Sequence, residues 1–125
     1  MLEKHISIFY YFYYFSYNNY NSLEKNILDK YAEFFGFVPV IADEYILSND
    51  ISCFSFEIKL EFVYSIHKVV LINYYLDNEI RKILKHFFLK IGFFNIDIEE
   101  FSFFMIESAL LGKSFKQLMT EISLG

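Results

Sequence analysis

Seven aromatic side chains follow one another without a break from Phe9 to Phe15. The apolar stretch around them, Ile6 to Tyr17, has about twelve residues, whereas a helix that spans a bilayer needs about twenty. No Lys or Arg occurs between His5 and Lys25, so the run lacks the cations that accompany aromatic residues on base-stacking surfaces. We therefore expect the run to be core, either as a strand covered on both faces or as a buried helix, since periodicity alone does not separate the two.

The compartment is predicted to be the cytoplasm. Lys4 precedes an apolar region of the length found in signal peptides, but the following SYNNYNS contains no small-x-small cleavage site. Cys53 is the single cysteine, which excludes an internal disulfide and fits a reducing environment.

Size and composition predict one domain, residues 1–125, with apolar surface to spare. The hydrophobic fraction of 55% and the aromatic fraction of 22% exceed ordinary globular usage, so a partner or a further copy of the chain could cover part of the surface. The formal net charge of −5 repels phosphate backbones and anionic lipid. We expect a neutral or basic protein partner, a possible homo-oligomer, no nucleic acid and no stable membrane insertion.

The first half of the chain is predicted to contain one helix, from Ser22 to Phe35. Asn21 and Glu24 have the spacing of a capping box, and Gly36 stands where a C-terminal glycine cap belongs. The apolar residues of this helix fall on one stripe: Leu23, Ile27, Tyr31, Phe34 and Phe35. The segment that follows, FVPVIADEYIL, is predicted as a short edge strand or a loop, because proline cannot donate to a β-ladder.

The strongest strand pattern runs from Cys53 to Tyr64. Apolar and polar residues alternate there, which is typical of a strand with one buried and one outward face. A turn at about residues 65–68 would return Val69 to Tyr75 beside it, although no Asn-Gly or Asp-Gly pair marks that turn.

Three helices are predicted in the remainder of the chain. Asp77 caps a helix from Asn78 to Ile91, Asp97 opens a very apolar helix that ends at Gly112, and SFKQ (114–117) opens a last short one. The outer face of the first of these helices is basic, with Arg81, Lys82, Lys85, His86 and Lys90. The predicted fold class is therefore α+β, with helices packed on one face of a largely antiparallel sheet.

No residue pattern predicts catalysis, a metal or a cofactor. Three of the four glycines are explained as helix ends, which leaves no Gly-rich phosphate loop, and the three histidines form no ligand pair. In the predicted hairpin Cys53 lies far from His67, which argues against a thiol–imidazole pair. Glu57 and Glu61 would lie about 13 Å apart on a strand, beyond the separation that glycosidases use.

The sequence feature that suggests a function is an acidic segment with aromatic neighbours. Between residues 43 and 61 five acids face the single cation Lys59, and two of the acids lie on the outward face of the predicted strand. Acidic side chains beside exposed aromatic residues suit the recognition of a cationic protein. The candidate partner-binding residues are Asp43, Glu44, Tyr45, Asp50, Glu57 and Glu61. The alternative is a solvated, acidic sheet face.

The chain resembles the small acidic immunity proteins of bacterial toxin systems, including contact-dependent growth inhibition. The resemblance lies in the runs FYYFYYF, NNYN and KNILDK and in the acidic stretch from ADEY to KLEF. It implies a non-enzymatic inhibitor that binds a cognate toxin domain, of a basic nuclease type, and blocks its active site. Phage-encoded inhibitors of nuclease defence look similar. A structural or scaffold subunit of an oligomer is the alternative function.

Overall fold

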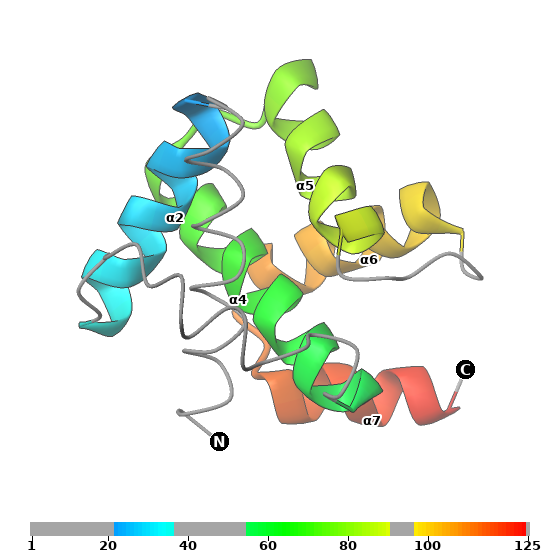
Figure 1. The fold of residues 1–125 in the computed structure, drawn as a ribbon. Coiled ribbons are helices and arrows are strands. Elements are labelled where there is room, and N and C mark those ends of the chain that lie inside the picture. The colour runs from blue at the N-terminus through cyan, green and yellow to red at the C-terminus, as the bar shows by residue number, and fades with distance from the viewer. Residues whose placement is uncertain (1–21, 37–54, 91–96, 125) are drawn as a thin grey trace. The chain divides into compact units, whose positions relative to one another are not determined.

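The computed structural model describes residues 22–36, 55–90 and 97–124, and the predictions made for residues 6–17 and 37–47 lie outside these ranges. The described residues form helices α2 (Ser22–Phe35), α4 (Phe56–Asn73), α5 (Asn78–Lys90), α6 (Ile98–Leu110) and α7 (Phe115–Leu124) (Figure 1). The chain divides into two compact units, Met1–Phe62 and Val63–Gly125, and their boundary falls within α4.

The predicted α+β fold is wrong. No strand occurs in the described residues, and the segment that alternation assigned to a hairpin is the single helix α4. Where the strand Cys53–Tyr64 and its return strand Val69–Tyr75 were predicted, Phe56–Asn73 form one 18-residue helix, and Cys53 lies outside the described residues. The antiparallel sheet on which the helices were expected to pack has no counterpart in this part of the chain.

The polar residues of α4 explain why the strand prediction failed. Up to Glu61 polar residues recur at every second position, as in a strand. From Glu57 to Ile72, however, the outward-facing residues are spaced four, four, three and four apart, which follows one face of a helix. That face carries Glu57, Glu61, Ser65, Lys68 and Ile72, all exposed or half-exposed. A turn at 65–68 would have interrupted the pattern, and no glycine, proline or asparagine is present there to form one.

Helix α2 has the predicted bounds and a different buried face. Ile27 and Tyr31 are buried as expected, whereas Phe34 is 63% exposed and Leu28 takes its place in the core. The Tyr31 ring contacts that of Phe62 edge-on, with 5.2 Å between centroids. Gly36 ends the helix at φ 76°, a left-handed conformation that glycine adopts without strain, as predicted.

The predicted starts of α5 and α6 are confirmed. Asp77 Oδ1 accepts a hydrogen bond from the backbone N–H of Ile80 at 2.9 Å, and Asp97 Oδ1 accepts one from Glu100 at 3.1 Å. These carboxylates satisfy N–H groups that have no partner within the helix. The buried residues of α5 follow one apolar stripe of the helix: Ile80, Ile83, Leu84, Phe87 and Phe88.

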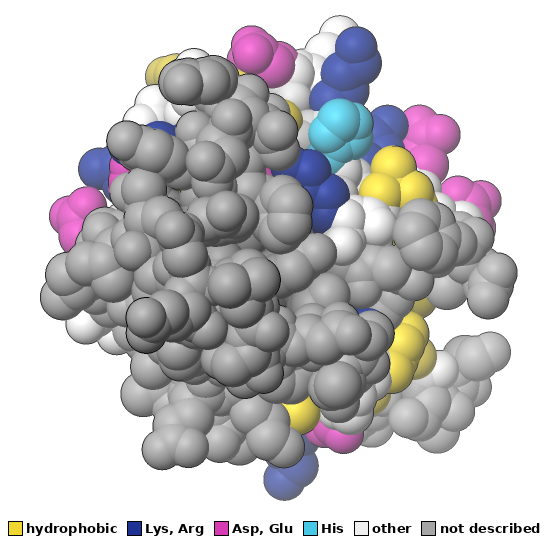
Figure 2. All heavy atoms as spheres, viewed as in Figure 1, with side chains coloured by type: hydrophobic (Ala, Val, Ile, Leu, Met, Phe, Trp, Pro, Cys, Tyr) yellow, Lys and Arg dark blue, Asp and Glu magenta, His cyan; other side chains and the backbone are white. Residues whose placement is uncertain are grey.

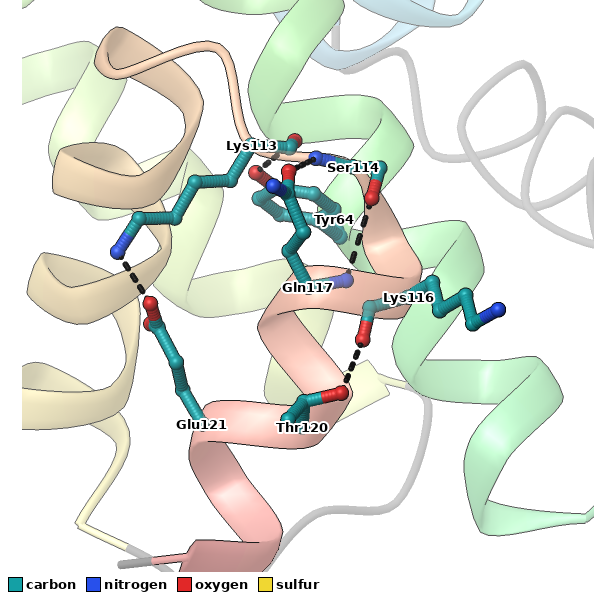
Figure 3. Close-up of polar contacts among 7 residues, drawn as sticks. All are labelled: Tyr64, Lys113, Ser114, Lys116, Gln117, Thr120 and Glu121. Carbon is teal, nitrogen blue, oxygen red and sulfur yellow. Dashed lines mark hydrogen bonds and ion pairs between the residues drawn. The ribbon is translucent and has the colours of Figure 1, made fainter.

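Polar contacts surround the first turn of α7, and one of them joins the segment just before α7 to α4 (Figure 3). The backbone N–H of Gln117 donates to Ser114 Oγ at 3.2 Å, and the Gln117 side chain accepts from the Ser114 N–H at 2.8 Å, which is the predicted capping box. The Tyr64 hydroxyl of α4 donates to the Lys113 carbonyl at 2.8 Å. Partial burial, and secondarily the charge of Glu121, raises the pKa of Tyr64, which keeps its hydroxyl a donor at neutral pH.

Candidate functional site

The predicted partner-binding residues are only partly described. Asp43, Glu44, Tyr45 and Asp50 lie outside the described residues. Glu57 and Glu61 lie on α4 one turn apart, with an axial rise of about 6 Å instead of the 13 Å expected for a strand. They still share a face, because four residues bring a helix back to the same side.

The two glutamates of α4 differ in exposure. Glu57 is exposed and follows Phe56, a large exposed side chain, whereas Glu61 is only half-exposed. Burial, and secondarily the negative charge of Glu61, raises the pKa of the Tyr31 hydroxyl above its usual range. Glu61 therefore lies near the buried Tyr31, and Glu57 is the member of the pair that is open to a partner.

A second acidic and apolar surface, which sequence analysis missed, lies on α6. We call it the α6 outer face and define it as the exposed residues of that helix: Glu99, Glu100, Phe103, Glu107 and Leu110. Residues 99, 103, 107 and 110 are spaced four, four and three apart, so they form one stripe along the helix. Phe103 is 53% exposed and Leu110 is 67% exposed, although both are types usually found in a core. The α6 outer face thus places two large apolar side chains among three carboxylates.

The carboxylates of the α6 outer face are largely uncompensated. Glu99 Oε1 lies 3.8 Å from Lys85 Nζ of α5, but the Glu99 side chain is 85% exposed, and such surface pairs contribute about 0–1 kcal/mol. Glu100 and Glu107 have no cationic partner within the described part of the chain. Helix α6 therefore presents negative charge along its exposed side.

A small pocket lies between α5 and α6, next to the α6 outer face. We call it the α5/α6 pocket; its volume is about 90 Å³. Its lining consists of Arg81 and Lys85 from α5 and of Glu99, Ser102, Phe103 and Ile106 from α6. Residues 81 and 85 are one turn apart on α5, and residues 99, 102, 103 and 106 share one side of α6, so the packing of the two helices forms the pocket.

Behind the pocket a buried histidine holds Ser102. His67 of α4 is fully buried; its Nδ1 lies 2.8 Å from the Val63 carbonyl oxygen and its Nε2 lies 3.1 Å from Ser102 Oγ. A carbonyl oxygen only accepts, so Nδ1 carries the proton and Nε2 accepts from the Ser102 hydroxyl. Desolvation by burial lowers the pKa of His67 to about 4, so the imidazole is neutral at pH 7. The Phe88 ring meets the imidazole edge-on, 5.5 Å away.

The His67–Ser102 pair has the contact of a serine nucleophile with its base, but its surroundings fit a structural role. A histidine with a pKa of about 4 is a weak base at neutral pH. Ser102 lies in the interior of α6, where backbone N–H groups are used by the helix and are not available as oxyanion donors. The pair therefore connects α4 to α6 by a satisfied buried hydrogen bond.

The basic face of α5 is exposed, as predicted. Lys82, His86 and Lys90 are exposed, and Arg81 and Lys85 are half-exposed. In Figure 2 Lys and Arg side chains gather around a histidine where Figure 1 shows α5. Cations and the carboxylates of α6 thus lie on two neighbouring helices that pack against each other.

Two further properties concern the described residues only. No group of three or more His, Cys, Asp or Glu side chains in residues 22–36, 55–90 and 97–124 is arranged to hold a metal ion. None of the helices described there is long and apolar enough to cross a bilayer.

Comparisons with protein-family models, with curated proteins and with solved structures find no match to this chain.

Proposed function

We propose that the chain is a non-enzymatic binding protein that inhibits a basic protein domain, as a toxin-immunity protein does. The observation that supports this proposal best is the α6 outer face, where Phe103 and Leu110 are exposed among three glutamates. Interfaces combine apolar or aromatic anchors at the centre with polar residues at the rim. The acidic rim would speed the encounter with a cationic partner, and the two apolar side chains would supply affinity once they are covered.

The charge of the α6 outer face favours a cationic partner over a second copy of this chain. A twofold symmetric dimer would place the same face against itself and bring three glutamates of one copy to three of the other. Like charges in such an interface are unfavourable. A basic domain would instead pair with Glu100 and Glu107, which have no cationic partner among the described residues. The scaffold alternative, in which the chain self-associates through this face, is therefore less favoured.

The acidic segment around Glu57 stays a second proposed contact. Phe56 and Glu57 repeat on α4 the combination of an exposed aromatic ring with an exposed carboxylate. We propose it as a contact distinct from the α6 outer face, because α6 and the start of α4 belong to different units. We further propose that the protein acts in the cytoplasm, which is where the resemblance to immunity proteins would place it.

A pull-down with three forms of the chain tests the proposal. The wild type, the variant Glu100→Gln/Glu107→Gln/Phe103→Ala and the control Glu33→Gln/Glu79→Gln are used as bait in host lysate at low salt. The control removes two exposed carboxylates from α2 and α5 and leaves α6 unchanged. We expect one basic protein to be retained by the wild type and the control and lost by the α6 variant. Equal retention by all three forms, or no retained protein, would contradict the proposal.

Inhibition is tested separately from binding. The retained protein is assayed for its own activity with and without a stoichiometric amount of the wild-type chain. We expect loss of activity with the wild type and with the control, and retained activity with the α6 variant. A partner that binds through α6 and keeps full activity would support binding and contradict inhibition.

A further inference from the structure

We propose that the α5/α6 pocket binds a short-chain monocarboxylate, with the Arg81 guanidinium as its anchor. This inference concerns a small ligand and does not rest on the proposed function. It follows from the size of the pocket, from the charge of its wall and from the hydrogen bond by which Ser102 gives its only hydroxyl proton to His67.

The size of the pocket fits a ligand of about five heavy atoms. The volume of about 90 Å³ exceeds the space that one water molecule needs, so the pocket admits a small organic ion. Phe103 and Ile106 form an apolar part of the wall, and Arg81 and Lys85 form a cationic part. A carboxylate joined to two carbon atoms matches both parts, because its carbon end faces the apolar side chains while its oxygens face the cations.

Arg81 is the cation that is available to a ligand. Its guanidinium has no acceptor within the described part of the chain, whereas Lys85 pairs with Glu99 at 3.8 Å. A guanidinium matches a carboxylate with two parallel N–H···O bonds, and the half-buried position beside Phe103 and Ile106 strengthens such a pair relative to open solvent. Lys85 adds a second positive charge if Glu99, which is mostly exposed, turns toward solvent.

Ser102 and Glu99 select against a phosphate. The Ser102 hydroxyl donates its only proton to His67 Nε2, so it offers the pocket an acceptor and no donor. The Glu99 carboxylate on the wall repels a phosphate dianion about twice as strongly as a monocarboxylate, because the dianion carries twice the charge. One guanidinium pairs with both oxygens of a monocarboxylate and balances its charge.

The test is a titration followed by ¹⁵N–¹H NMR at constant ionic strength, with propionate as the probe. Propionamide, which has the same shape without the charge, and inorganic phosphate serve as control ligands. We expect saturable shifts centred on residues 81, 85, 102, 103 and 106, with a Kd on the order of 1 mM, as suits so small a ligand. Propionamide and phosphate should bind at least about tenfold more weakly.

Two variants identify the anchor. Arg81→Gln should weaken propionate binding at least about tenfold, because it removes a charge-assisted pair. The matched control Lys82→Gln removes the neighbouring exposed cation, which does not line the pocket, and should bind as the wild type does. The same spectra show whether each variant is folded, and Arg81→Met, which keeps the aliphatic part of the side chain and removes the charge, is the substitute if Arg81→Gln is not. Shifts that do not saturate, equal binding of propionamide, or wild-type binding by a folded Arg81 variant would overturn the proposal.

Discussion

Acidification is expected to destabilise the protein through His67. The folded-state pKa is about 4 and the ordinary value is 6.5, so the unfolded state binds a proton more readily than the folded state between these values. The free energy of unfolding should therefore fall as pH decreases from about 6.5 to about 4. Below about pH 4 His67 should cause no further change. The full difference of about 2.5 pKa units corresponds to about 3 kcal/mol, of which about 2 kcal/mol is lost between pH 7 and pH 5.

The assay is urea unfolding of the wild type, His67→Gln and His86→Gln at pH 7 and pH 5. Glutamine at 67 keeps polar atoms near Ser102 and cannot titrate, whereas His86 is exposed and serves as the matched control. We expect the wild type and His86→Gln to lose about 2 kcal/mol more than His67→Gln over this interval, with unchanged m-values. An equal loss in His67→Gln would refute the assignment of His67 as a buried, neutral group.

Three substitutions near α7 test the local contacts by urea unfolding. Ser114→Ala removes the acceptor for the Gln117 N–H and should cost about 1 kcal/mol; no loss would contradict the capping box. Gly112→Ala should also cost about 1 kcal/mol, from backbone strain at φ 72° alone, since a Cβ there has no atom within 4 Å. Tyr64→Phe should cost about 1 kcal/mol by removing the hydrogen bond to the Lys113 carbonyl, and an unchanged stability would mean that water replaces it.

The helices were predictable where their signals are local. Asp77, Asp97 and Ser114 start α5, α6 and α7 through hydrogen bonds to residues three positions ahead, and Gly36 and Gly112 end helices through their own backbone conformation. Each signal needs only a few consecutive residues, so it survives whatever the tertiary structure is. The basic side of α5 followed from the same kind of reasoning.

The fold class was not predictable from the pattern that suggested a sheet. The alternation of residues 53–64 fits a strand, yet residues 56–64 form the first half of α4. Only the continuation of the pattern through Lys68 to Ile72 separates the two structures. The buried side of α4 also includes His67, a polar residue that interrupts the apolar pattern of that side in the sequence. Its burial is explained only by its hydrogen bond with Ser102 of α6. Non-local contacts of that kind decide between two local patterns of similar strength.

The α6 outer face could have been found in the sequence. Glu99, Glu100 and Glu107 mark the solvent side of the helix, and Phe103 and Leu110 fall within the same stripe. The high apolar content of the segment concealed this periodicity. The α5/α6 pocket, by contrast, depends on how two helices pack, which the sequence does not express.

The most direct test of the proposed function is the binding kinetics of the retained basic protein. Association and dissociation rates are measured for the wild type, Glu100→Gln/Glu107→Gln, Phe103→Ala and the control Glu33→Gln/Glu79→Gln at low and moderate salt. We predict slower association and weaker salt dependence for the α6 glutamate variant, and about tenfold faster dissociation for Phe103→Ala. Wild-type rates for both α6 variants would contradict the claim that α6 binds the partner.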